Sequence, residues 1–306
     1  MKNIMVFGAN GFIGSKLVKK LLLQQFLVIG YDYKAAPLLE DPNYTYIQGD
    51  FFNDTNFYDL LIQHKIDCIF HLISSSVPAE GTQDIDKDIS CNLLPSIRLL
   101  QAADKAGVKR LVFPSSGGTV YGEFSGSPNS EDQPTNPQCF YAAQKISIEA
   151  YLQLFSNITN LDCKIARISN PYGYCATDGR KQGIIPIFVD KLIKGEGITL
   201  FGETKRDYVY IDDVVEALIL LSEYEGNESV FNIGSGKSIL LSEVVREIED
   251  VLGKKFPQIE KLEIRSCDIK VSELDVSKAL HELHWKAKTP LKMGIEKLYQ
   301  EMKTRQ

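Results

Sequence analysis

The segment KNIMVFGANGFIG, residues 2–14, decides the fold of this 306-residue chain. Its apolar run Ile4–Phe7 predicts a β-strand, and the pattern Gly8-x-x-Gly11-x-x-Gly14 leads directly into a stretch with the apolar spacing of a helix. A glycine-rich turn between a strand and a helix lets backbone N–H groups approach a phosphate, and the helix N-terminus adds partial positive charge there. The segment therefore predicts a binding site for the pyrophosphate of a dinucleotide.

Apolar runs of strand length alternate with helical patterns along the first half of the chain, which predicts β-α-β units with parallel strands. Further strands are expected at 27–31, 45–48, 68–72, 110–113 and 164–168, and helices at 12–24, 88–106 and 141–156. The sequence therefore predicts an α/β fold. A doubly wound parallel sheet of the Rossmann type covers residues 1–171, and a smaller α/β domain covers residues 172–306, from which later segments are free to rejoin the first.

The composition restricts the classes of partner. The net charge is −6 and the isoelectric point is near 5.4, which argues against nucleic acid because phosphate neutralisation needs clustered Lys and Arg. No signal peptide is visible and no apolar stretch is long enough to span a bilayer, so we expect no membrane partner. The six cysteines show no C-x-x-C spacing and the four histidines form no ligand set. These counts predict reduced thiols, no metal and a cytoplasmic protein.

Asp32 ends the second expected strand. A carboxylate at this place accepts hydrogen bonds from the adenosine ribose hydroxyls and repels a 2′-phosphate, and no Arg directly follows it. The residue therefore predicts NAD as the cofactor in preference to NADP. The alternative interpretation is an exposed loop acid.

Tyr141 and Lys145 are one helical turn apart in the segment YAAQK, so both project from one face of the expected helix. A free phenol has a pKa near 10 and is a poor base at neutral pH, but a nearby ammonium stabilises the phenolate and lowers that pKa. The pair is therefore suited to general acid/base catalysis beside a dinucleotide, although the spacing alone is common.

The fifth expected strand runs into FPSSGGTVYG, residues 113–122. Ligands of open α/β sheets bind at the carboxyl ends of the strands. A hydroxyl in this segment is therefore placed to hydrogen-bond a reacting hydroxyl of the substrate, and the alternative is an ordinary Ser/Gly turn.

Because these motifs follow one another in this order, the chain resembles the extended short-chain dehydrogenases/reductases. Within them it is most similar to the NAD-dependent nucleotide-sugar epimerase/dehydratase family. The resemblance covers nearly the whole chain. Further segments that carry it are Asp50-Phe51, His71-Leu72, Asn92, 120–122, 167–173, 206–209, 212–214, 231–236 and Arg265 with Asp268.

The resemblance implies that Tyr141 is the acid/base and that Lys145 binds the nicotinamide ribose and tunes the phenol. Ser116 matches the family's catalytic Ser/Thr when residues are counted forward from the strand. Counting backward from the tyrosine–glycine pair that follows puts Gly117 there, because the segment holds one extra residue. Thr119 is the second candidate for the hydroxyl.

Other ligand-binding positions follow from the same resemblance. The implied cofactor-binding residues are Gly8, Asn10, Gly11, Phe12, Ile13, Gly14, Asp32, Asp50, Phe51, Leu72, Asn92, Tyr141 and Lys145. The implied substrate-binding residues are Ser116, Asn170, Ile184, Phe201, Arg206, Arg265 and Asp268, which makes residues 172–306 mainly a nucleotide-sugar-binding domain. The guanidinium groups of Arg206 and Arg265 can form paired hydrogen bonds with diphosphate oxygens. The alternative interpretation for each arginine is a surface ion pair.

The residues after Ser116 distinguish reactions within the family. Its 4,6-dehydratases carry Asp-Glu directly after the hydroxyl residue, whereas this chain has Gly117-Gly118. Without those carboxylates, elimination of water lacks its acid and base. The sequence therefore favours epimerisation of a nucleotide-diphosphate sugar, by default a UDP-hexose, at C4 through a transient 4-keto sugar.

Three enzyme alternatives stay open: a nucleotide-sugar 4-ketoreductase, a dehydratase and a decarboxylase of the same family. A non-catalytic dinucleotide-binding regulator is the alternative from another class, although such proteins tend to lose the Tyr or the Lys. The resemblance also implies a homodimer formed through the helices expected at 88–106 and 141–156.

Overall fold

The computed structural model describes residues 2–75, 85–123, 126–175, 183–264 and 269–304. The chain divides into two compact units that are each discontinuous in sequence. Unit 1 consists of Met1–Ser116, Cys139–Ala166 and Leu218–Phe231, and unit 2 consists of Gly117–Gln138, Arg167–Ala217 and Asn232–Gln306. Among the described residues, no helix is long and apolar enough to cross a membrane.

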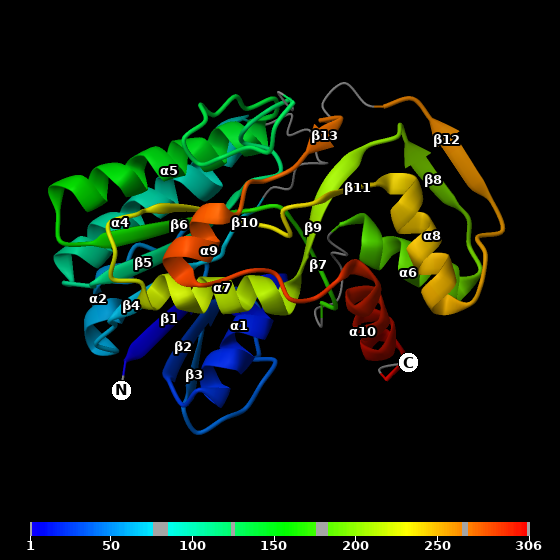
Figure 1. The fold of residues 1–306 in the computed structure, drawn as a ribbon. Coiled ribbons are helices and arrows are strands. Elements are labelled where there is room, and N and C mark those ends of the chain that lie inside the picture. The colour runs from blue at the N-terminus through cyan, green and yellow to red at the C-terminus, as the bar shows by residue number, and fades with distance from the viewer. Residues whose placement is uncertain (1, 76–84, 124–125, 176–182, 265–268, 305–306) are drawn as a thin grey trace. The chain divides into compact units, whose positions relative to one another are not determined.

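The central sheet of seven strands gives unit 1 its architecture (Figure 1). In spatial order its strands are β10 (Val230–Ile233), β6 (Asp162–Ile168), β5 (Arg110–Ser116), β4 (Cys68–His71), β1 (Asn3–Phe7), β2 (Leu27–Asp32) and β3 (Tyr44–Gln48). The pairs from β5 to β3 are parallel. The order reverses between β1 and β4, so the predicted doubly wound sheet is confirmed, and its switch point lies beside the glycine-rich turn.

Helices cover both faces of this sheet. Helices α2 (Phe57–Gln63), α4 (Leu94–Lys105) and α5 (Phe140–Ile158) lie on one face, and α1 (Phe12–Leu23) lies on the other (Figure 1). Apolar side chains from the strands pack against the first group around the rings of Phe7, Phe51 and Phe57. Burial of this apolar surface is the main force that holds the helices against the sheet.

The helix expected at 88–106 is instead three consecutive elements: α3 (Ile85–Asp88), the π-helix η1 (Ile89–Leu93) and α4. A π-helical turn inserts one residue and leaves backbone groups open to other partners. Here the carbonyl of Asp88 accepts hydrogen bonds from the side chains of Asn92, at 3.3 Å, and Gln144, at 3.0 Å. The second contact ties this turn to α5.

Unit 2 is built from smaller sheets and the helices around them. A four-stranded sheet contains β11 (Ser238–Leu240), β9 (Lys205–Tyr210), β13 (Val271–Ser272) and β7 (Asn170–Tyr172), and a two-stranded sheet pairs β12 (Ile259–Leu262) with β8 (Ile198–Phe201). The helices are α6 (Ile184–Lys194), α8 (Leu241–Leu252), α9 (Ser277–Leu283) and α10 (Leu291–Lys303). Helix α7 (Ile211–Glu223) begins in unit 2 and ends in unit 1.

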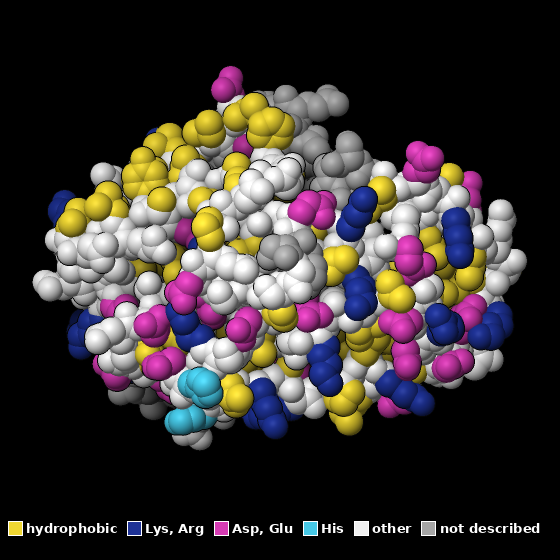
Figure 2. Space-filling view, turned by 45° about the horizontal axis from the view of Figure 1, so that its top comes forward, with side chains coloured by type: hydrophobic (Ala, Val, Ile, Leu, Met, Phe, Trp, Pro, Cys, Tyr) yellow, Lys and Arg dark blue, Asp and Glu magenta, His cyan; other side chains and the backbone are white. Residues whose placement is uncertain are grey.

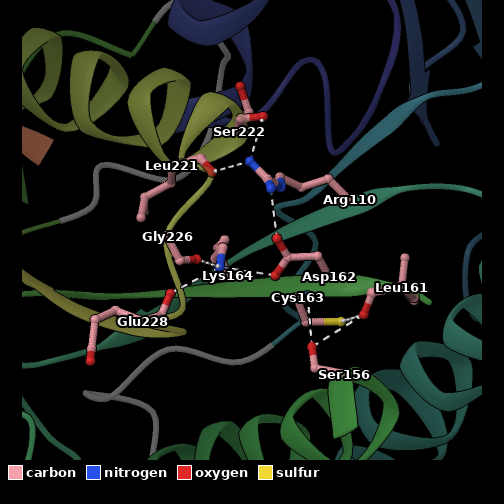
Figure 3. A network of polar contacts seen from close by, with 10 residues as sticks. All are labelled: Arg110, Ser156, Leu161, Asp162, Cys163, Lys164, Leu221, Ser222, Gly226 and Glu228. Carbon is pink, nitrogen blue, oxygen red and sulfur yellow. Dashed lines mark hydrogen bonds and ion pairs between the residues drawn. The ribbon is translucent and has the colours of Figure 1, made fainter. Parts of the chain in front are cut away.

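A network of charged side chains lies in unit 1 where β5 and β6 begin (Figure 3). Asp162 pairs with Arg110 at 2.6 Å and with Lys164 at 3.0 Å, and both cations are largely buried. Arg110 also donates to the carbonyl oxygen of Ser222 at 3.1 Å, while Lys164 donates to that of Glu228 at 3.0 Å. The network therefore anchors the end of α7 and the segment that leads to β10.

We predict that Asp162→Asn destabilises unit 1, because it leaves two buried cations without their counter-charge. Breaking a buried ion pair costs roughly 3–5 kcal/mol. The Asp162 side chain is 36% exposed, so water reduces this loss to about 2 kcal/mol of unfolding free energy. Urea unfolding measures the change. The matched control is Glu216→Gln, which breaks an exposed pair with Lys288 and should leave the midpoint unchanged. Equal midpoints for both variants would contradict the prediction.

Candidate active site

The turn after β1 is shaped so that only glycine fits at two of its positions. Gly8 has φ +86°, in the left-handed region, and its N–H donates to the carbonyl oxygen of Tyr31 at 2.8 Å. A Cβ on Gly14 would lie 1.9 Å from the Gly8 carbonyl oxygen, so α1 packs directly on the turn. Gly11 is the N-cap of α1 and has no side chain to occupy the first N–H groups of the helix. This turn therefore fits a pyrophosphate group.

Asp32 lies at the end of β2 and is 5% exposed. One of its carboxylate oxygens accepts the N–H of Asn10 at 3.0 Å, and the other accepts the N–H of Lys34 at 3.3 Å. Each oxygen retains a second lone pair for a ribose hydroxyl. The arrangement therefore fits the adenosine ribose of NAD.

Asn10 links the phosphate turn to the loop that follows β2, a role that the sequence pattern did not indicate. Its side-chain amide donates to the carbonyl oxygen of Ala36 at 2.9 Å and to the hydroxyl of Tyr46 at 3.0 Å. The Tyr46 hydroxyl in turn donates to the carbonyl oxygen of Lys34 at 2.6 Å. These bonds hold the loop beside Asp32, so Tyr46 is a site residue that sequence reasoning missed.

The remaining cofactor positions lie in different surroundings. Phe12 begins α1 and is largely buried, and Ile13 beside it is half-buried. Asp50 closes its own turn by accepting the side-chain amide of Asn53 at 2.7 Å. Phe51 is buried in the aromatic core, 5.3 Å between ring centroids from Phe57. Leu72 follows β4, and its N–H donates to the Phe7 carbonyl oxygen at 3.0 Å.

Tyr141, Lys145 and Ser116 come together at the carboxyl end of β5. Tyr141 lies in the first turn of α5, and its hydroxyl is hydrogen-bonded to the Ser116 side chain. The Lys145 ammonium donates to the carbonyl oxygen of Pro114 at 3.0 Å and lies 5.8 Å from the centroid of the Tyr141 ring. Ser116 therefore lies beside the phenol. Thr119, the second candidate, belongs to unit 2.

Burial determines the protonation of both groups. It raises the pKa of Tyr141 to about 12, against the effect of the Ser116 hydrogen bond. It lowers the pKa of Lys145 to about 8, against the effect of Glu149. We expected the ammonium to lower the pKa of the phenol, but desolvation of the phenolate is the larger effect, and the ammonium donates to Pro114 instead. Without a ligand, the phenol is protonated at neutral pH.

Asn92 joins the π-helix to the loop after β4. Its side-chain oxygen accepts the N–H of Ser75 at 2.8 Å, and its amide donates to the Ser75 hydroxyl at 2.6 Å. Its own carbonyl oxygen accepts the Ser96 hydroxyl at 2.6 Å. Asn92 is 4% exposed, so its contribution within the described residues is to hold the chain at the end of β4.

His71, at the end of β4, is a buried imidazole whose hydrogen bond goes to Ser96 and not to the proton-transfer groups. Its Nε2 lies 2.7 Å from the Ser96 hydroxyl, whose own proton goes to Asn92, so Nε2 carries the hydrogen. Among the described residues, Nδ1 has no hydrogen-bond partner. Burial, together with the charge of Lys145, lowers the pKa of His71 to about 3. The imidazole is therefore neutral at physiological pH.

The substrate positions of the second half lie on unit 2. Asn170 donates to the Asp207 carbonyl oxygen at 2.9 Å, and Arg206 donates to the carbonyl oxygens of Lys205 and Lys270 at 3.1 and 3.2 Å. Ile184 starts α6 and Phe201 ends β8, 37% exposed. Arg265 and Asp268 lie outside the described residues.

Asp207 is a fully buried carboxylate next to Arg206 in β9. It accepts the N–H of Ser235 at 2.7 Å and that of Gly236 at 3.1 Å. Burial raises its pKa, whereas these hydrogen bonds lower it. Asp207 thereby fixes the turn after β10 against β9. Within the described residues, no group of three or more His, Cys, Asp or Glu side chains is arranged to hold a metal ion.

Comparison with known proteins identifies the family. Residues 4–234 match the model of the NAD dependent epimerase/dehydratase family. The chain therefore belongs to this family, whose members modify nucleotide sugars with NAD as the cofactor, and the glycine turn and Asp32 fit that cofactor.

Individual relatives cover almost the whole chain. A dTDP-4-dehydro-6-deoxyglucose reductase of Escherichia coli is 34% identical, and a UDP-glucose 4-epimerase of Mycolicibacterium smegmatis is 33% identical, each with 96% of both chains covered. The crystal structure of UDP-glucose 4-epimerase from Thermotoga maritima, with UDP-glucose, superposes with a TM-score of 0.92 at 30% identity and covers 99% of both chains.

We predict that His71 makes the protein sensitive to acid. In the unfolded chain this imidazole takes up a proton near pH 6.5, whereas the folded protein keeps it neutral down to about pH 3. The unfolded state therefore binds more protons in this range, and stability is lost as the pH falls through 6.5, by up to about 1.4 kcal/mol per pH unit.

Urea unfolding of the wild type and of His71→Gln, between about pH 7 and 5, measures this contribution. The variant should lose less stability on acidification than the wild type. The control is His281→Gln, at an exposed position, which should follow the wild-type curve. Parallel curves for the wild type and His71→Gln would exclude the effect.

Proposed function

We propose that this protein epimerises a nucleotide-diphosphate sugar, by default a UDP-hexose, at C4. The observation that carries the proposal is the cluster of Tyr141, Ser116 and Lys145 at the carboxyl end of β5, two strands away from the glycine turn. Neighbouring strands are about 4.8 Å apart. A dinucleotide whose pyrophosphate binds at β1 therefore has the reach to bring its nicotinamide to β5.

Each group has a role in this reaction. NAD held at the glycine turn would supply the hydride acceptor for C4, and the hydride would return to the opposite face once the 4-keto sugar has turned. Tyr141 takes the proton of the C4 hydroxyl and later gives it back to the keto oxygen, and Ser116 orients that oxygen by a hydrogen bond. The protonated phenol is the form required for the return step. The Ser116 hydrogen bond favours the phenolate needed for the forward step.

The residues after Ser116 support epimerisation over elimination or decarboxylation. Gly117 has no space for a larger side chain, because a Cβ there would lie 2.6 Å from Leu274 Cδ1 and 2.7 Å from the carbonyl oxygen of Arg167. The first of the two dehydratase carboxylates therefore does not fit at Gly117 in this packing. We assign Asn170, Arg206 and Arg265 to the nucleotide diphosphate, and Asp268 to a ribose or to the support of Arg265.

A nucleotide-sugar 4-ketoreductase is the second candidate, and the 34% identity to the reductase of Escherichia coli favours it. Both reactions use the same phenol, hydroxyl and hydride position. They differ in how the cofactor is used, because a reductase consumes one reduced nicotinamide in each turnover. Asp32 argues against the NADPH that such reductases usually prefer.

We predict that the purified protein converts UDP-glucose, UDP-N-acetylglucosamine or UDP-glucuronate into the C4 epimer without added cofactor. Chromatography of the products measures this. Tyr141→Phe should lower the rate by about 10²–10⁴-fold, because the acid/base group is lost. Turnover that requires stoichiometric NAD(P)H and a 4-keto sugar would instead establish the reductase. NAD binding without any turnover would indicate the non-catalytic regulator.

We also infer a homodimer formed through α4 and α5. Figure 2 shows hydrophobic side chains gathered over the helices of unit 1. On α5, Tyr151, Leu154 and Ile158 are 39%, 48% and 68% exposed at helical spacing, and Leu94 of α4 is 42% exposed. Contiguous apolar surface of this kind marks protein contacts. An isologous contact buries the same helices from both copies.

We predict that the double variant Leu154→Glu/Ile158→Glu is monomeric, because a dimer would then bury four carboxylates in an apolar contact. Sedimentation velocity measures the mass. Leu23→Glu is the matched control, because Leu23 is 72% exposed on α1, on the other face of the sheet, and this variant should remain dimeric. A wild-type protein that is monomeric at micromolar concentration would disprove the dimer.

A further inference from the structure

Glu149 is a buried carboxylate that the reaction, as described, does not use. It lies on α5, one helical turn beyond Lys145, and is only 3% exposed. Removing a carboxylate from water is costly unless it is paired and hydrogen-bonded. A charged side chain retained at such a place must therefore have compensating contacts in the structure.

The carboxylate is held by β5, the strand that carries Ser116. The Ser115 hydroxyl donates to Glu149 Oε1. Ser115 is 5% exposed, and its two neighbours in β5 contact Lys145 and Tyr141. Three consecutive strand residues thus meet three helix residues spaced one turn apart, so a shift of α5 along β5 would break all three contacts.

The charge of Glu149 also acts on Lys145. The ammonium is 5% exposed and has the Phe113 ring 4.5 Å from its nitrogen and the Pro114 carbonyl oxygen 3.0 Å away, which provide no full negative charge. Burial lowers the pKa of Lys145, and Glu149 opposes this shift. Loss of the carboxylate would therefore favour the neutral amine.

We propose that Glu149, held by Ser115, is a positioning residue that keeps the Lys145 side chain charged and in place beside Tyr141. This inference rests on the proposed function for its catalytic consequence. Its electrostatic consequence for Lys145 is independent of which reaction the protein catalyses.

Two titratable groups around the ammonium keep one form over the relevant range. Tyr141 on the same helix is protonated below about pH 12, and His71 at the end of β4 is neutral above about pH 3. Asp88, before the π-helix, accepts a hydrogen bond from Gln144 of α5 at its backbone carbonyl oxygen. Cys139, directly before α5, affects the pKa of Tyr141, and an ordinary thiol titrates near pH 8.5. A change in the pH profile near pH 8 is therefore assigned to Lys145 only together with the titration midpoint of that lysine.

The test compares Glu149→Gln with the wild type. Gln keeps the shape and an oxygen that accepts the Ser115 hydrogen bond, but it removes the charge. We expect the pH at which kcat falls on the alkaline side to be lower in Glu149→Gln than in the wild type, because burial lowers the pKa of Lys145 and Glu149 opposes that shift. At about pH 8, kcat should fall by roughly tenfold, with KM for the sugar nucleotide changed by less than about threefold.

A second readout needs no turnover. Competitive acetylation of lysines at a series of pH values, followed by peptide mass spectrometry, gives the titration midpoint of Lys145 directly. This midpoint should also move to lower pH in Glu149→Gln. If no sugar nucleotide is converted by the wild type, the proposed function fails, but this measurement still decides the role of Glu149.

Two further variants separate positioning from general stability. Glu149→Asp keeps the charge and shortens the reach to Ser115, so it should restore the wild-type midpoint of Lys145 while kcat remains reduced. Glu249→Gln is the matched control, because Glu249 is a buried carboxylate of unit 2, 8% exposed, paired with Lys255 at 2.8 Å. It should lower stability without moving the midpoint. An unchanged Lys145 midpoint in Glu149→Gln would overturn the proposal.

Discussion

Burial of the Lys145 ammonium between α5 and β5 is the constraint on which the candidate site depends. A cation with 5% exposure is stable only where acceptors are fixed in advance, and β5 provides a carbonyl oxygen at 3.0 Å. The same strand end then provides the hydroxyl of Ser116 to Tyr141 and that of Ser115 to Glu149. The dry surroundings that make this ammonium costly also keep the Tyr141 phenol protonated.

The order of the strands relates this cluster to the dinucleotide turn. β4 alone separates β5 from β1, and the switch point of the sheet lies between β1 and β4. The glycine turn, Asp32 and the proton-transfer groups therefore all lie at the carboxyl ends of strands in unit 1. The buried aromatic cluster around Phe7 and Phe51 packs β1 and the loop after β3 against α2.

Relatives that act as a reductase and as an epimerase are about equally similar to this chain. This is expected from the chemistry, because hydride and proton are exchanged at the same carbon and oxygen in both reactions, and the roles proposed for Tyr141, Ser116 and Lys145 suit both. The difference between them arises from the affinity for the cofactor and the space around the sugar. Gly117 bears on a third reaction, the dehydration. It is packed against Leu274 and the Arg167 carbonyl oxygen, which leaves no space there for the carboxylate of a dehydratase.

The sequence by itself determined the Rossmann-type sheet, because glycine spacing and apolar periodicity act over a few neighbouring residues. It also placed Tyr141 and Lys145 on one face of a helix. Only the tertiary structure decided which hydroxyl meets the phenol, that a π-helix interrupts the helix expected at 88–106, and that burial raises the pKa of Tyr141. It also grouped 117–138 with unit 2 and 218–231 with unit 1. These features depend on what packs around a residue from distant parts of the chain, and local patterns contain no information about desolvation.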